Sequence, residues 1–154
     1  MPIKTVEELI PIIEKLKKEN KTVVTINGSF DILHKGHIHI LEQAKAQGDV
    51  LIVGLNSDSS IKQYKGPTRP IKDQETRARI LSSLDPVDYV LIFNETTPIN
   101  FLEKLKPHVH ANGSEYGKDC IEAPTVKKHG GRIHIINRIP DHSSTNIIDR
   151  MKDE

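Results

Sequence analysis

Short runs of β-branched and aliphatic residues alternate along this chain with segments whose apolar residues recur at helical spacing. The runs predict strands over residues 22–26, 50–55, 89–93, 109–111 and 132–137. The other segments predict helices over residues 6–18, 37–46, 74–84, 99–105, 123–128 and 145–151. Two parallel strands need a crossover connection, usually a helix. The alternation therefore predicts an α/β fold, with a doubly wound (Rossmann-like) parallel sheet and helices on both faces.

Two segments depart from this alternation. Pro11 lies inside the first predicted helix, and because proline lacks a backbone N–H we expect it to break or kink that helix. Residues 58–72 form the longest stretch without a pattern, which we interpret as a functional loop rather than a domain boundary. With no repeat and no low-complexity linker, residues 1–154 are expected to fold as a single domain.

The composition excludes several classes of protein. Hydrophobic residues make up 36% of the chain, and no apolar run reaches the ~20 residues that a membrane-spanning helix needs. The 22 basic and 21 acidic residues leave a net charge of +1, unlike a general nucleic-acid binder. The first residues lack a secretory signal pattern, and the single cysteine, Cys120, has no partner for a disulfide within the chain. We therefore expect a cytoplasmic protein that binds neither membranes nor nucleic acids.

The segment GSFDILHKGH, residues 28–37, follows the first predicted strand and leads into the next helix. Ligands of parallel sheets bind at this place, where the N–H groups that begin the helix attract anions. Gly28 permits a sharp exit from the strand, and Gly36 permits a close approach of the backbone to a ligand. His34 and His37 would lie at the start of the helix, where their N–H groups can donate to phosphate oxygens. This context favours a binding role over the alternative, a turn in which the histidines serve only as caps.

The motif resembles the signature Gly-x-Phe-Asp-x-x-His-x-Gly-His of a nucleotidyltransferase family that includes cytidylyltransferases and adenylyltransferases. The resemblance covers most of the chain and extends through NSDSSIKQYKGPTRPI, QETRARIL, ANGSEYG and HSSTNIIDRM. Within the family, the segments NSD, KG, RPI and SSTNII are most similar to the D-glycero-β-D-manno-heptose 1-phosphate adenylyltransferases of bacterial lipopolysaccharide synthesis. Some bacteria fuse this activity to a sugar kinase. No kinase sequence is present here, so the resemblance implies the stand-alone form.

This resemblance implies transfer of AMP from ATP to a heptose 1-phosphate, with release of pyrophosphate and formation of ADP-heptose. ATP and a sugar phosphate are the implied partners, and Mg²⁺ is the implied cofactor because a triphosphate normally arrives as its metal complex. Members of the family are often dimers, which implies a possible homodimer. Such a reaction requires alignment of two polyanions and stabilisation of growing charge more than a protein nucleophile.

The resemblance also implies roles for the residues of the motif. His34 and His37 are expected to contact the triphosphate and stabilise the transition state, while Ser29, Phe30 and Gly36 supply contacts around the turn. Asp31, the acid nearest the turn, could order the loop or act on the metal through water, and Lys45 could reach phosphate but is better explained as a solvated lysine.

We expect no metal site made by the protein itself. His39 could join the two motif histidines as a third ligand, but it falls on a different helix face and no second ligand cluster is near. We interpret the histidines further along the chain as surface or strand-face residues: His108, His110, His129 and His134.

Two basic residues downstream are further candidates for the catalytic site. Lys65 resembles the main phosphate contact of a family loop, although ordinary solvated charge explains it about as well. On a helix, Arg77 shares a face with Ile80, Leu81 and Leu84, so its guanidinium must find an anion or a carbonyl group. The resemblance implies a phosphate, and the alternative is a structural ion pair with a buried acid.

Further nucleotide-binding residues are implied in two segments. By resemblance they are Asn112, Gly113, Ser114, Glu115, Arg138, Ser143, Ser144 and Thr145. Residues 112–115 follow a predicted strand and would line the nucleotide pocket, with a plain turn as the alternative. Residues 143–145 would hold the triphosphate, a role compatible with capping the helix that follows, because a cap and a phosphate use the same N–H groups. Arg138 resembles an arginine more typical of the cytidylyltransferase relatives.

Three functions stay open at this point. The leading one is the heptose 1-phosphate adenylyltransferase. The second is another member of the same reaction class, a CTP:glycerol-3-phosphate cytidylyltransferase or an FMN adenylyltransferase, which Arg138 favours. The third is a nucleotide-binding module without turnover, against which the intact His34 and His37 argue.

Overall fold

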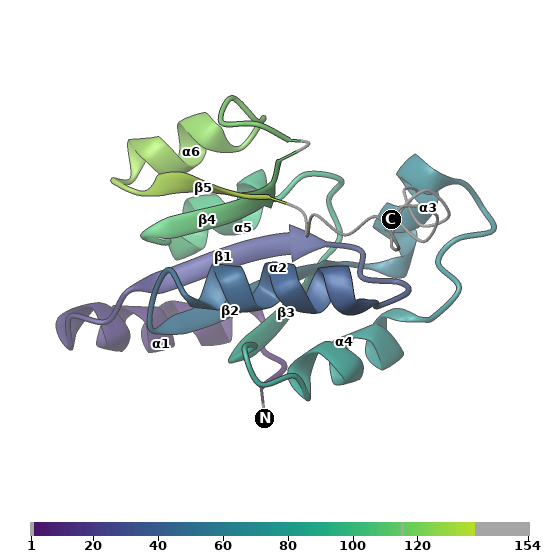
Figure 1. Ribbon diagram of the computed structural model, residues 1–154, viewed down its shortest axis with the longest axis horizontal. Coiled ribbons are helices and arrows are strands. Elements are labelled where there is room, and N and C mark those ends of the chain that lie inside the picture. Colours follow the sequence, from purple (N-terminus) through teal and green to yellow (C-terminus); the bar gives the residue numbers. More distant parts are fainter. Residues whose placement is uncertain (1, 115, 138–154) are drawn as a thin grey trace.

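The computed structural model describes residues 2–114 and 116–137 (Figure 1). In chain order its elements are α1 (Val6–Lys18), β1 (Val23–Gly28), α2 (Lys35–Lys45), β2 (Val50–Asn56), α3 (Asp58–Lys65), α4 (Gln74–Ser82), β3 (Tyr89–Phe93), α5 (Ile99–Leu105), β4 (Val109–Gly113), α6 (Ala123–Lys128) and β5 (Arg132–Ile136). The five predicted strands are all present, which confirms the strand assignments made from the alternation. The last predicted helix, residues 145–151, lies outside the described residues.

The five strands form one parallel sheet in the order β3-β2-β1-β4-β5. The first three strands build outward from β1 in one direction, and the chain then crosses back to place β4 on the other side of β1. Strand β1 pairs with β2 along its whole length, from Val23 to Gly28. With β4 it pairs only at Val24 and Thr25, so the two strands part before their carboxyl ends. The reversal of strand order between them is where open α/β sheets bind ligands.

Helices cover both faces of the sheet (Figure 1). One apolar cluster joins strand residues such as Val24 and Ile26 to Leu41 of α2 and Leu81 of α4. A second cluster on the opposite face joins Val23 to the helices α1, α5 and α6. Alternate residues of β1 thus serve opposite faces, as the period of two in a strand requires. The predicted doubly wound α/β fold is confirmed.

Two local expectations differ from the structure. Pro11 does not break helix α1, which runs unbroken from Val6 to Lys18, because its capped start and its buried face outweigh one missing hydrogen bond. Thr5 and Glu8 form a capping box at its start, Leu9 and Ile13 are buried, and Pro11 itself lies on the exposed side, where water can satisfy the carbonyl group left without a donor.

None of the described helices is both long and apolar enough to cross a membrane.

The second error concerns residues 58–72, which do not form a continuous loop. Their first half is helix α3, capped by the Ser57 hydroxyl, which accepts a hydrogen bond from the N–H of Ser60. In this helix of eight residues Ile61 is the buried hydrophobic residue, so the sequence shows no apolar period that would reveal it. Helix α3 lies beyond the carboxyl end of β1 (Figure 1), which brings its last residue toward the motif.

Candidate functional site

The turn after β1 has a conformation that its residues explain. Phe30 adopts a left-handed backbone conformation with φ of 48°, and only 7% of the residue is exposed. The ring lies so close to Gly28 that a Cβ at that position would come within 2.9 Å of it. Gly28 is therefore needed because the Phe30 ring occupies the space of a side chain there. The ring also packs against that of His37 in a T-shaped arrangement, with 5.6 Å between the ring centroids.

Both motif histidines are fixed at the start of α2 through their Nδ1 atoms. His34 is the N-cap residue, and its Nδ1 accepts a hydrogen bond of 3.0 Å from the Gly36 N–H. His37 Nδ1 accepts a hydrogen bond of 3.3 Å from the His34 N–H. A ring nitrogen that accepts carries no proton, so each neutral imidazole carries its proton on Nε2 and can donate it there. The ring centroids are 4.2 Å apart, which places two donors side by side at a helix N-terminus.

Gly36 has a second reason to be a glycine. A Cβ at this position would lie 2.7 Å from Cε1 of the His34 ring, a contact that real side chains do not make. Its absence lets the imidazole fold back over the first turn and reach the backbone N–H. The spacing His-x-Gly-His thus produces the paired arrangement of the rings.

Asp31 orders the loop that follows α3. Its carboxylate oxygens accept hydrogen bonds of 2.8 Å from the N–H groups of Ile71 and Lys72, and Arg69 Nη1 lies 3.7 Å from Asp31 Oδ2. The Asp31 side chain is 2% exposed. Of the two roles considered for this residue, the loop-ordering role therefore has direct structural support.

Arg77 is a buried arginine that joins the motif turn to other segments. Its guanidinium donates to the carbonyl oxygens of Ser29, Asn56 and Lys72 at 2.8, 2.8 and 2.9 Å. It also donates to Asp58 at 2.8 Å, and its side chain is fully buried. As the helical face predicted, the guanidinium has found carbonyl groups and an acid. This geometry favours the structural ion pair over the expected direct contact with phosphate.

Two lysines have different surroundings. Lys65, the last residue of α3, points its Nζ toward the Ser29 hydroxyl at 3.4 Å, so the helix that sequence patterns missed delivers a cation to the motif. Lys45, at the last turn of α2, forms an ion pair with Asp88 at 2.5 Å. Because α2 begins at the motif and Lys45 ends it, Lys45 lies at the opposite end of that helix, and this pairing accounts for it without a phosphate.

A cavity of about 120 Å³ lies where β1 and β4 part. Its lining includes Ser29, Phe30 and His37 from the motif together with Asn112 and Gly113 from the end of β4. The expected site residues from these two distant segments therefore come together. Ser114 is exposed just beyond β4. The other expected nucleotide-binding residues lie outside the described residues: Glu115, Arg138, Ser143, Ser144 and Thr145.

A buried polar network that reaches this cavity through Asn112 was missed by sequence reasoning. His110 on β4 is fully buried, with Nδ1 2.7 Å from the Thr25 hydroxyl and Nε2 3.2 Å from Glu122 Oε2. The same carboxylate oxygen accepts a hydrogen bond of 3.2 Å from the Asn112 side-chain amide. His110 therefore lies on a strand face, as expected, but in the interior as a link in a chain of hydrogen bonds. The one available signal was a histidine and an asparagine two residues apart on a strand, hence on the same face.

The charge of Glu122 depends on these partners. Burial alone would raise the pKa of its carboxyl group, but hydrogen bonds from His110 and from its own backbone N–H, with the charge of His110, lower it to about 2. The neighbouring thiol of Cys120 has its pKa raised to about 11 by burial and by the nearby Glu122. Glu122 is therefore a carboxylate at neutral pH, and it holds the amide of Asn112 in one orientation.

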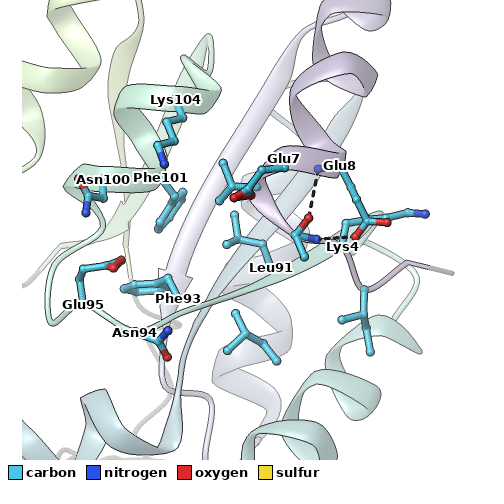
Figure 2. A pocket seen from close by; sticks show the side chains of 14 residues that line it. Lys4, Glu7, Glu8, Leu91, Phe93, Asn94, Glu95, Asn100, Phe101 and Lys104 are labelled. Atoms are coloured by element: carbon cyan, nitrogen blue, oxygen red, sulfur yellow. Dashed lines mark hydrogen bonds between the residues drawn. The ribbon is translucent and has the colours of Figure 1, made fainter.

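A larger pocket of about 390 Å³ lies elsewhere, between the start of α1, the end of β3 and α5 (Figure 2). The dashed lines there are the two hydrogen bonds of the capping box, Thr5 N–H to Glu8 and Glu8 N–H to the Thr5 hydroxyl, of 3.0 and 3.2 Å. Its lining includes none of the residues expected to bind or react, so size alone does not mark the functional site.

Among residues 2–114 and 116–137, no group of three or more His, Cys, Asp or Glu side chains is placed to hold a metal ion.

Comparison with known proteins agrees with the geometry of the motif. Residues 25–150 match the family model described as cytidylyltransferase-like. The bifunctional protein HldE of Geobacter metallireducens is 44% identical over 155 residues, which cover 97% of this chain and 31% of that protein. The HldE of Campylobacter concisus is 46% identical over 152 residues, covering 98% of this chain and 31% of its own length. The chain thus spans about a third of the length of these curated relatives.

Solved structures agree on the fold. A lipopolysaccharide core biosynthesis protein from Thermoplasma volcanium has a TM-score of 0.62 and 31% identity, covering 77% of this chain and 97% of its own. The pantoate-beta-alanine ligase of Francisella tularensis has the same TM-score of 0.62 at 18% identity, covering 94% of this chain and 69% of its own, and supports the fold alone. The family match extends from β1 to well beyond β5 and includes both motif histidines. The chain belongs to the cytidylyltransferase-like family.

Proposed function

We propose that this chain is a nucleotidyltransferase that transfers AMP from ATP to a heptose 1-phosphate, forming ADP-heptose and releasing pyrophosphate. The observation that carries the proposal is the pair of imidazoles at the start of α2. Their Nδ1 atoms are held by backbone N–H groups, so their Nε2–H groups are oriented donors for a polyphosphate. The helix N-terminus adds its own attraction for anions at the same place.

The chemistry needs no covalent intermediate on the protein. An oxygen of the sugar phosphate attacks the α-phosphorus of ATP and forms a new P–O bond. The bond from the α-phosphorus to the oxygen that bridges to the β-phosphate breaks, and pyrophosphate carries away that oxygen and its electron pair. His34 and His37 would donate to phosphate oxygens as charge shifts toward the leaving group, and Lys65 would add a positive charge beside the Ser29 turn.

The remaining residues would bind and position the substrates. Ser29, Phe30 and Gly36 shape the turn that approaches the phosphates, and Asn112 and Gly113 would contact the nucleotide from β4. Ser114, Glu115, Arg138, Ser143, Ser144 and Thr145 remain predicted nucleotide contacts. For Arg77 we propose a positioning role, because its bonds join the motif turn, the end of β2 and the loop before α4.

We propose that Mg²⁺ enters with ATP as part of the substrate. Mg²⁺ prefers phosphate oxygens and retained waters to an all-protein cage, so the triphosphate itself would supply its main ligands. Both carboxylate oxygens of Asp31 already accept backbone hydrogen bonds, which makes it a support of the loop. We further propose a cytoplasmic location, where ATP is available, and a homodimer as the form to test.

The choice of a heptose phosphate as acceptor has two supports. Residues 56–71 and 142–151 resemble the heptose 1-phosphate adenylyltransferases. The Thermoplasma neighbour, at 31% identity, is described as a protein of lipopolysaccharide core biosynthesis. Neither support depends on Arg138, the residue that kept the cytidylyltransferase alternative open.

The test is pyrophosphate release by the purified protein with Mg²⁺. ATP and CTP are each combined with heptose 1-phosphate, glycerol 3-phosphate and FMN. We expect release with ATP and heptose 1-phosphate alone. Release with CTP or with another acceptor would move the protein to a sister activity, and ATP binding without release in any combination would make it a binding module.

A further inference from the structure

The side chain of Asn27 contains a buried oxygen, Oδ1, that has no hydrogen-bond partner among the described residues. Buried side-chain oxygens in folded proteins almost always have a partner, so an orphaned one requires an explanation. Asparagine is also disfavoured in strands, and Asn27 lies within β1. Local structure therefore explains neither the residue nor its lack of a partner.

The place of Asn27 supplies an explanation. It lies at the end of β1, in the lining of the cavity where β1 and β4 part. The nearby carboxamide on β4, that of Asn112, is already committed, because its amide donates to Glu122 Oε2 and to Cys120 Sγ at 3.2 Å each. None of the described residues donates a hydrogen bond to Asn27 Oδ1, so a molecule that enters the cavity is a source for the missing donor.

We propose that Asn27 is a substrate-contacting residue whose side-chain oxygen accepts a hydrogen bond from a neutral O–H or N–H group of a substrate. This inference rests on the proposed function, which supplies the two substrates. A carbonyl oxygen repels phosphate oxygens, which carry no proton to donate when ionised. The groups that fit are the hydroxyls of the ribose, the amino group of the base and the hydroxyls of the acceptor sugar. Asn27 thus binds the sugar or the base, while the histidines and Lys65 bind the phosphates.

The test removes the side-chain oxygen of Asn27 without leaving a cavity in its place. The variant Asn27→Leu keeps a side chain of similar size and loses the acceptor. We expect the dissociation constant of one substrate, measured by calorimetric titration, to rise about tenfold, as for one lost hydrogen bond, and that of the other to stay unchanged. The melting temperature of the ligand-free protein should not fall, because an atom without a partner is removed.

Substrate analogues identify the source of the donor. Inosine triphosphate lacks the amino group of adenine, and 2′-deoxy-ATP and 3′-deoxy-ATP each lack one ribose hydroxyl. If the donor belongs to the nucleotide, one of these analogues binds about tenfold more weakly to the wild type and binds equally to wild type and variant. If the donor belongs to the acceptor, the titration of the sugar phosphate alone changes.

The matched control is Asn94→Leu. Asn94 is an exposed asparagine just after β3 that lines the larger pocket, and its replacement should leave both affinities unchanged.

Unchanged affinities in Asn27→Leu would overturn the proposal, and so would a lower melting temperature with weaker binding of both substrates, which would mark a purely structural role. A wild type that binds both ligands but releases no pyrophosphate would refute the proposed function alone. A wild type that binds neither ligand would refute both.

Discussion

The variant Arg77→Met separates the two interpretations of the buried arginine. Methionine retains a long unbranched side chain but removes every donor. Three backbone carbonyl groups and Asp58 would then lose partners that lie at 2.8 to 2.9 Å. The arginine side chain is fully buried, so water cannot take its place as the donor to these carbonyl oxygens.

The expected cost follows from this burial. Removing one partner of a buried ion pair typically costs about 3–5 kcal/mol, because the remaining groups stay buried without compensation. The Asp58 side chain is 31% exposed and can recover some hydration, so we expect the lower part of that range, about 3 kcal/mol. This is a large fraction of the roughly 5–15 kcal/mol that stabilises a domain of this kind.

The assay is urea unfolding at neutral pH, followed by circular dichroism, with nucleotide affinity measured on the same preparations. The matched control is Arg79→Met, because Arg79 is an exposed arginine on the same helix, and its loss should change the free energy of unfolding by less than about 0.5 kcal/mol. If Arg77→Met unfolds like the wild type while its nucleotide affinity falls sharply, the positioning role is wrong and Arg77 contacts a phosphate directly.

Three further predictions follow from the same geometry. Replacing His34 or His37 by alanine should lower kcat far more than it weakens ATP binding, and equal losses would make these histidines ground-state ligands. The pKa of Glu122, lowered to about 2 from 4.5, gives stability that is complete above pH 5 and lost as the pH falls toward 2. Urea titrations should therefore show the wild type losing about 2 kcal/mol relative to Glu122→Gln between pH 5 and pH 3, and parallel curves would contradict this. In Asp31→Ala, residues 66–72 should become the first site of limited proteolysis, and an unchanged cleavage pattern would mean that other contacts hold the loop.

Much of the site could be anticipated from local patterns. The motif placed two histidines at a helix start, and they lie there because His34 caps α2 and Gly36 leaves room for its ring. The helical face of Arg77 predicted that its guanidinium would be buried and would need carbonyl groups or an acid, and this is confirmed. Helix α3 escaped prediction because Ile61 is the buried hydrophobic residue in it, and a period cannot be seen from one residue.

By itself the sequence determined the alternation of strands and helices, the position of the turn predicted to bind phosphate and the faces on which side chains lie. These depend on backbone periods of 2 and 3.6 residues, which neighbouring residues set. Only the tertiary structure decided which distant groups meet. Arg77 joins three segments, His110 joins Thr25 to Glu122, and Asn27 has an acceptor oxygen with no partner among residues 2–114 and 116–137. The partner of a buried polar group depends on which strands lie side by side, and no local pattern carries that information.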